Sequence, residues 1–151
     1  MAKTKNKYDY PVDKNKIRRI TSRESPAHVD TLKYSLDFIV PVGTPIKAAA
    51  DGKVIEVKAD SDVGGIDKSL ELFGNYIEIE HVGGEYSEYE HLRKGGVAVK
   101  PGDSVKRGQL IGYSGATGWI AHLGSHLHFM VGTYGKTVKE YQTLEIVWRK
   151  Q

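Results

Sequence analysis

The sequence predicts an all-β domain, built as a flattened β-sandwich or half-barrel of antiparallel strands. Three observations lead to this class: short runs of β-type residues follow one another, glycine-rich turns separate them, and one turn-strand-turn unit occurs twice. The chain has 17 glycines among 151 residues and few patterns of helical length, which favours sheet over helix. A chain of this length has room for one continuous hydrophobic core, so we expect a single folded domain.

Seven runs are predicted as strands because turn residues bound segments that are rich in β-branched and aromatic residues. In chain order they are Ser35–Val40, Gly52–Lys58, Asn75–His81, Glu85–His91, Gln109–Ser114, His126–Thr133 and Leu144–Arg149. Glycine and proline turn signals lie between them, such as Gly83-Gly84 and Pro101-Gly102. Only Asp60–Leu72 is ambiguous, and it has room for a short helical turn.

The repeated unit becomes visible when Val40–Gly52 is aligned with Val99–Gly112. The alignment pairs a turn glycine and an apolar residue of each copy: Gly43 with Gly102, and Ile46 with Val105. Similar hairpins form the rim of biotin- and lipoyl-carrier domains, so the repeat indicates a fold and not a chemistry.

The first 27 residues differ from the rest of the chain. They are polar and rich in lysine, contain Pro11 and Pro26, and show no sustained periodicity. We therefore predict an extended N-terminal arm over residues 1–27 and a folded domain over residues 28–151. Neither a secretory signal nor a membrane-spanning stretch is found, so we expect no membrane partner. The protein then works inside the cell, is exported by another route, or is a trimmed form of a secreted protein.

Charge and composition narrow the possible partners. The chain has 22 basic and 19 acidic residues, a net charge of +3, which is too small an excess to indicate nucleic acid. It has no cysteine, so any metal must be held by histidine, carboxylate or water. The six histidines are therefore the first candidates, and the oligomeric state is left open.

The segment Ser125–Phe129 carries the strongest local signal. Side chains on a strand alternate between its two faces, so His126 and His128 share one face while Leu127 and Phe129 point toward the core. Paired histidines also arise by chance on solvated strands. This pair alone therefore leaves a functional role and an inert surface equally open.

Two further residues are candidates for the same site. His91 follows Tyr89 with the strand period of two, at the end of a predicted strand. Asp37 lies among apolar residues in Leu36–Val40, where a buried carboxylate needs a cation. An exposed aspartate on an edge strand is the alternative, and this segment alone does not decide between them.

Six motifs occur in a fixed order between Asp37 and Val131. They are Asp37 with the following GTPIKAAADGKV, Gly74–His81, Tyr89–Leu92, Gly108–Gly112, Gly115–Gly118 and His126–Phe129. In order and spacing they resemble the lysostaphin/LytM-type zinc metalloendopeptidases, peptidoglycan peptidases that share a duplicated hybrid motif. Several motifs in the right order identify a family far better than one pattern does.

The resemblance implies one zinc ion per chain, held by two histidines and an aspartate, with two catalytic histidines beside it. Asp37 and His128 match the second and third zinc ligands of the family. His91 and His126 match the catalytic histidines, one of which would act as the general base.

The first zinc ligand departs from the common family pattern. That pattern places a histidine four residues before Asp37, where this chain has Lys33, and a lysine cannot replace it at neutral pH. One branch of the family has a longer spacing, and Ser25–His28 followed by Tyr34–Phe38 is similar to that branch. The resemblance therefore implies His28 as the ligand, against the alternative of a histidine in a flexible arm with no partner.

The other predicted features concern the surroundings of the site. Loops 60–74 and 115–125 are expected to form the walls of a narrow groove, where Tyr113 and Trp119 offer flat apolar surface to a peptide substrate. His81 is in phase with the apolar residues of its strand, which favours packing or a site wall over ligation. His122 is expected to be exposed in its loop.

The function implied by the resemblance is hydrolysis of peptide bonds in peptidoglycan stem or cross-bridge peptides, such as a Gly-Gly or D-Ala bond, by a metal-activated water. Two other functions stay open. A catalytically inactive module of the same fold could activate a partner hydrolase, and Lys33 is the residue that supports this reading. A carrier or phosphotransfer domain could also use the repeated hairpin, but the Met-Lys dipeptide of biotinyl domains is missing.

Overall fold

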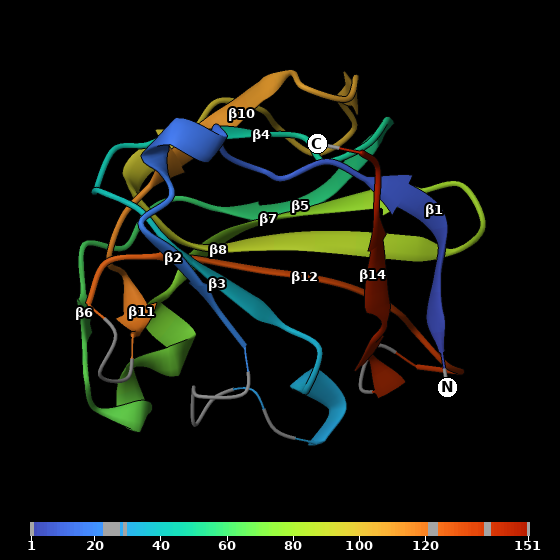
Figure 1. The fold of residues 1–151 in the computed structure, drawn as a ribbon. Coiled ribbons are helices and arrows are strands. Elements are labelled where there is room, and N and C mark those ends of the chain that lie inside the picture. The colour runs from blue at the N-terminus through green and yellow to red at the C-terminus, as the bar shows by residue number, and fades with distance from the viewer. Residues whose placement is uncertain (1, 23–27, 29, 121–123, 138–139, 151) are drawn as a thin grey trace.

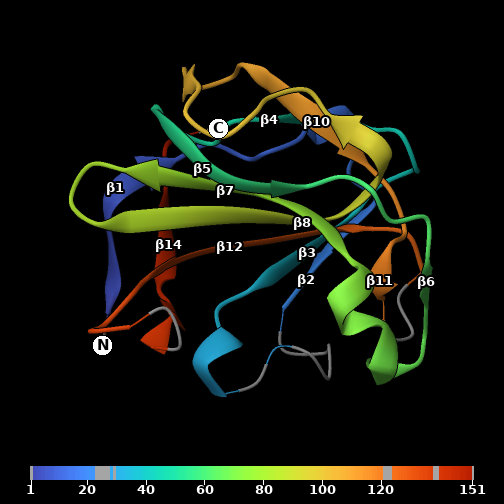
Figure 2. The ribbon, with the colours of Figure 1, turned by 180° about the vertical axis from the view of Figure 1, so that it is seen from behind.

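The computed structural model describes residues 2–22, 28, 30–120, 124–137 and 140–150, and the structural statements below concern these residues. Fourteen strands and three 3-10 turns are found in this part of the chain. Ten strands form one sheet, whose main order is β2-β3-β12-β8-β7-β5-β9, with β4, β10 and β13 attached (Figures 1 and 2). The sheet pairs are antiparallel, which confirms the predicted fold class.

The ten strands of this sheet are short, apart from β5, β7, β8 and β12, which have seven or more residues. They are β2 (Arg19–Thr21), β3 (Leu36–Ile39), β4 (Pro45–Lys47), β5 (Gly52–Lys58), β7 (Asn75–His81), β8 (Glu85–Val97), β9 (Ser104–Val105), β10 (Leu110–Ser114), β12 (Leu127–Thr133) and β13 (Gln142–Thr143). Two parallel pairs lie outside the sheet: β1 (Lys3–Tyr8) with β14 (Glu145–Trp148), and β6 (Gly64–Gly65) with β11 (Gly118–Trp119). The 3-10 turns are η1 (Lys14–Lys16), η2 (Asp30–Leu32) and η3 (Lys68–Phe73).

Each of the seven predicted runs contains a strand. β5 and β7 have the predicted bounds, whereas β8 continues beyond its predicted end to Val97. The ambiguous segment 60–72 holds β6 and most of the turn η3. The three 3-10 turns have three to six residues, and no helix in the described ranges is long and apolar enough to cross a membrane.

The repeated unit has the same backbone shape in both copies. Gly43 and Gly102 have φ angles of 85° and 96°, a conformation that favours glycine. Ile46 and Val105 are both buried. Each copy pairs with the strand that begins at the end of the other copy, β4 with β10 and β9 with β5. The two copies therefore hold each other in place.

The central strands have one core face and one outer face. Tyr89 lies opposite Ile77 and Phe129 in the strand ladders, and all three side chains are fully buried. Because side chains alternate along a strand, the next row, which contains Glu90 and His128, faces the other side of the sheet. The candidate site lies on this outer face.

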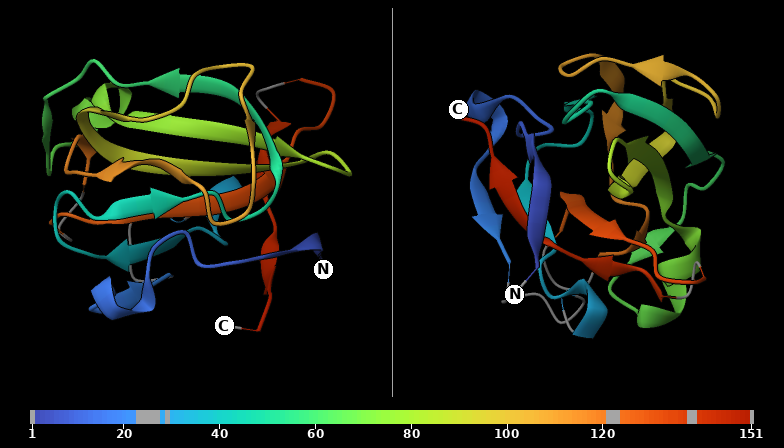
Figure 3. Two further views of the ribbon diagram at one scale, coloured as in Figure 1. Left: turned by 90° about the horizontal axis from the view of Figure 1, so that it is seen from above. Right: turned by 90° about the vertical axis from the view of Figure 1, so that its right-hand side faces the viewer.

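The N-terminal part of the chain is extended but paired. β1 pairs with β14 across the direction of the central strands, and β2 covers the free edge of β3 (Figures 1 and 3). Tyr8 is fully buried in the core, where its hydroxyl donates a hydrogen bond to Glu85 (2.9 Å). Glu85 also accepts hydrogen bonds from the backbone N–H groups of Lys5 (2.6 Å) and Asn6 (3.2 Å). The division of the chain at residue 28 stays a prediction.

Candidate metal centre and active site

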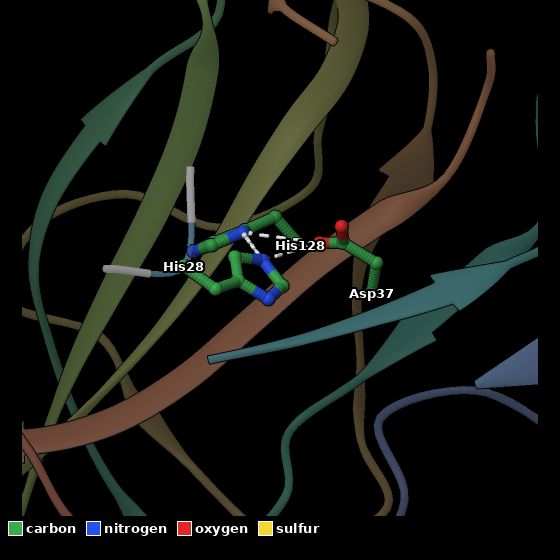
Figure 4. Close-up of side chains that lie close together, drawn as sticks. All are labelled: His28, Asp37 and His128. Atoms are coloured by element: carbon green, nitrogen blue, oxygen red, sulfur yellow. Dashed lines mark hydrogen bonds and ion pairs between the residues drawn. The ribbon is translucent and has the colours of Figure 1, made fainter. Parts of the chain in front are cut away.

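Three buried side chains from distant parts of the sequence meet on the outer face of the sheet (Figure 4). Asp37 lies directly opposite His128 in the β3/β12 pair, so both side chains point the same way. His28 reaches them from the segment after β2. Asp37 Oδ1 lies 3.1 Å from both His28 Nε2 and His128 Nδ1, and the two nitrogens are 3.2 Å apart.

This trio has the donor atoms and the spacing that a zinc ion requires. Nitrogen and carboxylate ligands bind zinc at about 2.0–2.2 Å in a tetrahedral arrangement, so the ligand atoms themselves lie about 3.3 Å apart. The three observed separations of 3.1, 3.1 and 3.2 Å are close to that value. No second group of this kind occurs within the described ranges. The geometry brings the three predicted ligands together.

His28 is oriented by a backbone carbonyl. Its Nδ1–H donates to the carbonyl oxygen of Ser22 at 2.5 Å, so Nε2 is the ring nitrogen that faces Asp37. Ser22 directly follows β2, so the pairing of β2 with β3 fixes the position of this carbonyl. Sequence reasoning missed Ser22 because a backbone carbonyl leaves no side-chain signal.

Asp37 is charged although it is only 1% exposed. Burial alone disfavours the charged form, but hydrogen bonds from His128 and His28 outweigh it and lower the pKa of Asp37 below its usual value. β3 lies between β2 and β12, so Asp37 is not an exposed residue of an edge strand. The sequence indicated that a carboxylate among apolar neighbours needs a partner. The imidazoles of His28 and His128 are the partners of Asp37.

His91 and His126 lie beside the trio. Their ring centroids are 4.7 Å apart, and His126 Nε2 lies 3.5 Å from Asp37 Oδ1. Each ring donates its Nδ1–H to a backbone carbonyl, His91 to Thr117 (2.7 Å) and His126 to Gly124 (2.8 Å). Each Nε2 is therefore free of its proton and able to accept one.

Burial keeps both of these rings neutral. It lowers the pKa of His91 to about 3, and repulsion from His126 and His128 adds to this when those rings are protonated. Burial likewise lowers the pKa of His126. The pKa of His128 is raised, because the charges of Glu90 and Asp37 outweigh its burial. Near neutral pH the pair His91 and His126 consists of two neutral bases.

A β-bulge in β8 turns His91 into the site. Asn75 and Tyr76 are neighbours on β7 but pair with Leu92 and Glu90, so His91 is the extra residue. Its φ angle is 70°, which is rare for a residue other than glycine. With regular alternation His91 would share the core face with Tyr89, and the bulge places it in the site instead.

Two side chains hold the bulge. The carbonyl of Leu92 accepts hydrogen bonds from the Thr117 hydroxyl (2.6 Å) and the Asn75 side-chain amide (3.1 Å). The backbone N–H of Asn75 in turn donates to the Thr117 hydroxyl (3.0 Å). Both residues lie in motifs noted in the sequence, where a polar residue beside glycine was the available signal, but no role was predicted for them.

A small pocket of about 110 Å³ opens next to the trio. Its lining residues come from η2, the two predicted loops and the central strands: Leu32, Glu71, Glu90, His91, Trp119 and His128. Trp119 is held by a hydrogen bond from its indole N–H to the carbonyl of Ile66 (3.2 Å). Tyr113 does not line this pocket, and its ring instead packs against the guanidinium of Arg93 (4.6 Å).

The remaining candidates lie elsewhere. His81 is buried on the core side, between the carbonyl of Asp51 (2.7 Å) and the hydroxyl of Ser87 (2.8 Å), and so has a packing role. Lys33 is exposed and lies over the ring of Tyr34, away from the trio. His122 lies outside the described residues.

Comparison with known proteins identifies a family. The sequence model of Peptidase family M23 matches residues 31–140. Asp37, His91, His126 and His128 fall inside the matched range, whereas His28 lies just before it.

Relatives and solved structures agree with this match. The peptidoglycan DD-endopeptidase ShyB of Vibrio cholerae is 40% identical over 128 residues, which cover 81% of this chain and 26% of ShyB. The crystal structure of a zinc-containing peptidase from Vibrio cholerae has a TM-score of 0.61 at 38% identity, covering 83% of this chain and 36% of that one. The structure of the antimicrobial peptidase lysostaphin from Staphylococcus simulans has a TM-score of 0.59 at 31% identity, covering 83% of this chain and 46% of that one. The chain thus spans about a quarter of ShyB and less than half of the two solved chains.

Proposed function

This chain belongs to peptidase family M23, and on that premise we propose that it is a zinc-dependent endopeptidase acting on peptidoglycan stem or cross-bridge peptides. The observation that carries the proposal is the convergence of His28, Asp37 and His128, whose donor atoms lie within 4.8 Å of one another. The names of the relatives add support, because ShyB is a peptidoglycan DD-endopeptidase.

His28, Asp37 and His128 would hold the zinc ion. Two histidines and one carboxylate leave one tetrahedral position open, as in catalytic zinc sites, whereas structural sites have four protein ligands. When bound, zinc would supply the Lewis acidity that activates water and polarises the scissile carbonyl.

His91 and His126 would handle the proton. Each points Nδ1 at a backbone carbonyl and so leaves Nε2 for the reaction. One ring would take the proton from the attacking water at an unprotonated Nε2, and the other, once its Nε2 carries a proton, would stabilise the oxyanion or the leaving nitrogen by a hydrogen bond. Depressed pKa values suit this work, since a ring that is already protonated cannot act as a base.

The pocket favours a substrate with small residues. A volume of about 110 Å³ beside the indole of Trp119 leaves little room for large side chains at the scissile bond. Glycine and alanine fit such a space, as in a Gly-Gly or D-Ala bond. Trp119 would support the peptide backbone, and a contact of Tyr113 with more distant parts of the substrate stays a prediction.

Single substitutions test the two sets of roles. We expect His28→Ala, Asp37→Ala and His128→Ala to lose bound zinc, measured as zinc per chain by elemental analysis. We expect His91→Ala and His126→Ala to keep zinc and lose most turnover. Full activity in either of the last two variants would contradict the catalytic assignment, and a wild-type chain without zinc would favour the inactive regulatory module.

The substrate class is tested by digestion. Purified cell walls and free glycine peptides are incubated with the wild-type chain, with and without a zinc chelator, and the released amines are quantified. We expect release that the chelator abolishes and that added zinc restores. His91→Ala is the matched control, because it keeps the metal site but lacks one proposed base.

A further inference from the structure

Each site histidine has one ring nitrogen that points away from the centre of the site, called here its outer nitrogen. The outer nitrogen of His128 differs from the other three in its hydrogen bonding. His28, His91 and His126 each donate Nδ1–H to a backbone carbonyl, those of Ser22, Thr117 and Gly124. His128 turns Nδ1 toward Asp37, so its outer nitrogen is Nε2 on the opposite side of the ring. No described residue makes a hydrogen bond with this Nε2. A ligand histidine without an outer partner is unusual, because that partner fixes the tautomer and the ring orientation.

Glu90 is the carboxylate that the sheet places directly opposite His128. In this position of the β8/β12 ladder, two Cβ atoms are about 4.5–5.5 Å apart. The two side chains share one face of the sheet and line the same pocket. Among the described residues, Glu90 has neither a hydrogen bond nor an ion pair through its carboxylate. A carboxylate without a donor therefore faces an imidazole without an acceptor.

We propose that Glu90 is a positioning residue of the metal centre, whose carboxylate accepts the Nε2–H of His128. This inference rests on the proposed function, because it takes His128 as a metal ligand. A neutral imidazole has one N–H, and holding it at Nε2 leaves the lone pair of Nδ1 for the metal. The carboxylate also makes the ring a more basic ligand, and loss of such a partner weakens metal binding by about 10- to 100-fold.

Glu88 provides a matched control. It lies two residues before Glu90 on the same face of β8 and opposite Met130 instead of His128. Two residues of a strand span about 7 Å, which is beyond direct hydrogen bonding to His128. Both side chains place a carboxyl group on this face, where burial raises the pKa of Glu88 well above its usual value, but only Glu90 lies opposite the ring of His128. The pair therefore separates a contact specific to Glu90 from the general effect of removing a carboxyl group from this face.

Zinc affinity measured by competition with a fluorescent chelator tests the inference. We expect Glu90→Ala to bind zinc about 10- to 100-fold more weakly than wild type. Glu90→Gln keeps an acceptor oxygen but no charge and should fall between the two. Glu88→Gln should stay within about twofold of wild type. Thermal unfolding of the metal-free variants shows whether a change reflects folding alone.

Nitrogen NMR of the imidazoles adds a readout that a general structural role would not move. In the zinc-loaded wild type we expect a slowly exchanging Nε2–H signal for His128, which should exchange faster in Glu90→Ala. Wild-type affinity and an unchanged Nε2–H signal in Glu90→Ala would overturn the inference. So would an equal loss of affinity in Glu88→Gln. If the wild-type chain binds no zinc, the proposed function fails, which is a distinguishable result.

Discussion

His91 combines a strained backbone with a ring that burial keeps neutral. Its φ angle of 70° costs free energy in any residue with a Cβ, and such strain is typically found at functional sites. Its depressed pKa, about 3, adds a second cost at acidic pH. Both costs are understandable if the ring serves as a base beside the metal ligands.

The first prediction concerns acid sensitivity. The pKa of His91 is about 3 in the folded chain and about 6.5 when unfolded, so folding favours the neutral ring. Its contribution to stability is complete above about pH 6.5 and is lost as the pH falls toward 3. At pH 5 this amounts to up to about 2 kcal/mol. Without metal, the free energy of unfolding of His91→Asn should therefore fall less between pH 7 and pH 5 than that of wild type, by up to about 2 kcal/mol.

Urea denaturation at the two pH values measures this difference. His128, whose pKa is raised, has the opposite pH dependence, but it is present in both proteins and cancels in the comparison. Equal losses in wild type and variant would show that His91 does not titrate as described.

A second prediction uses the backbone of the same residue. Alanine at a positive φ keeps the strain, whereas glycine relieves it, and the difference is worth about 1 kcal/mol. We therefore expect His91→Gly to be more stable than His91→Ala by about this amount, although both lack the ring. The urea midpoints of the two variants provide the comparison, provided that their unfolding free energies depend equally steeply on urea concentration. A more stable alanine variant would argue against a left-handed conformation at this position.

At the level of elements, the bulge in β8 depends on a polar clamp. Asn75 is fully buried, and its side chain joins Leu92 to Ser61 through three hydrogen bonds of 2.8–3.1 Å. Removing the amide leaves buried backbone groups without partners, and each such group costs about 1–3 kcal/mol. The clamp thus connects the loop at Ser61, the start of β7 and Leu92, which directly follows His91.

We expect Asn75→Ala to lower the free energy of unfolding by roughly 2–4 kcal/mol and to reduce activity, because the bulge is no longer held. Asn6→Ala is the control, since the Asn6 side-chain amide donates an exposed hydrogen bond to the carbonyl of Val82 (2.8 Å), whose loss should cost little. Equal effects in the two variants would contradict the clamp.

Side-chain patterns predicted the strands whose residues alternate, and they missed the elements that lack such a pattern. β5 and β7 were predicted with their bounds because turn residues delimit runs that are rich in β-branched residues. β1 reads KTKNKY and buries mainly Thr4 and Tyr8, so its pairing with β14 at the far end of the chain left no local signal. The bulge at His91 was missed for the opposite reason, because the alternation looked regular.

The candidate site was predictable where side chains form motifs. Asp37, His91, His126 and His128 stand in recognisable order, and all of them converge in the structure. His28 came only from the resemblance, because its spacing to Asp37 is not the common one. The carbonyls of Ser22 and Thr117 could not be predicted, since their role depends on tertiary contacts and not on residue type.

At the scale of the whole molecule, the N-terminal residues contribute to both the core and the site. Tyr8 is buried in the core, and β2 fixes the Ser22 carbonyl that orients His28. A chain restricted to residues 28–151 would keep all five proposed metal and catalytic residues but lose these supports.

We expect this shortened chain to be several kcal/mol less stable, because loss of one large buried aromatic side chain alone costs about 3–5 kcal/mol. Tyr8→Ala is the matched variant, as it removes the core contact and keeps β2. Zinc affinity should fall in the shortened chain and stay near wild type in Tyr8→Ala, with chelator competition at a temperature where both are folded as the measurement. Equal zinc affinity in the two would show that β2 is dispensable for the metal centre.

The proposed ligands His28 and His128 touch each other across 100 positions of sequence. While the chain is being synthesised, His28 and Asp37 therefore leave the ribosome long before the residue that completes their cage. No fragment ending before His128 possesses the full set of donors, however well its first strands fold. Competence for the proposed hydrolysis would then arrive in one late step, and a protein cut anywhere between these two histidines would give no half that holds all three proposed ligands.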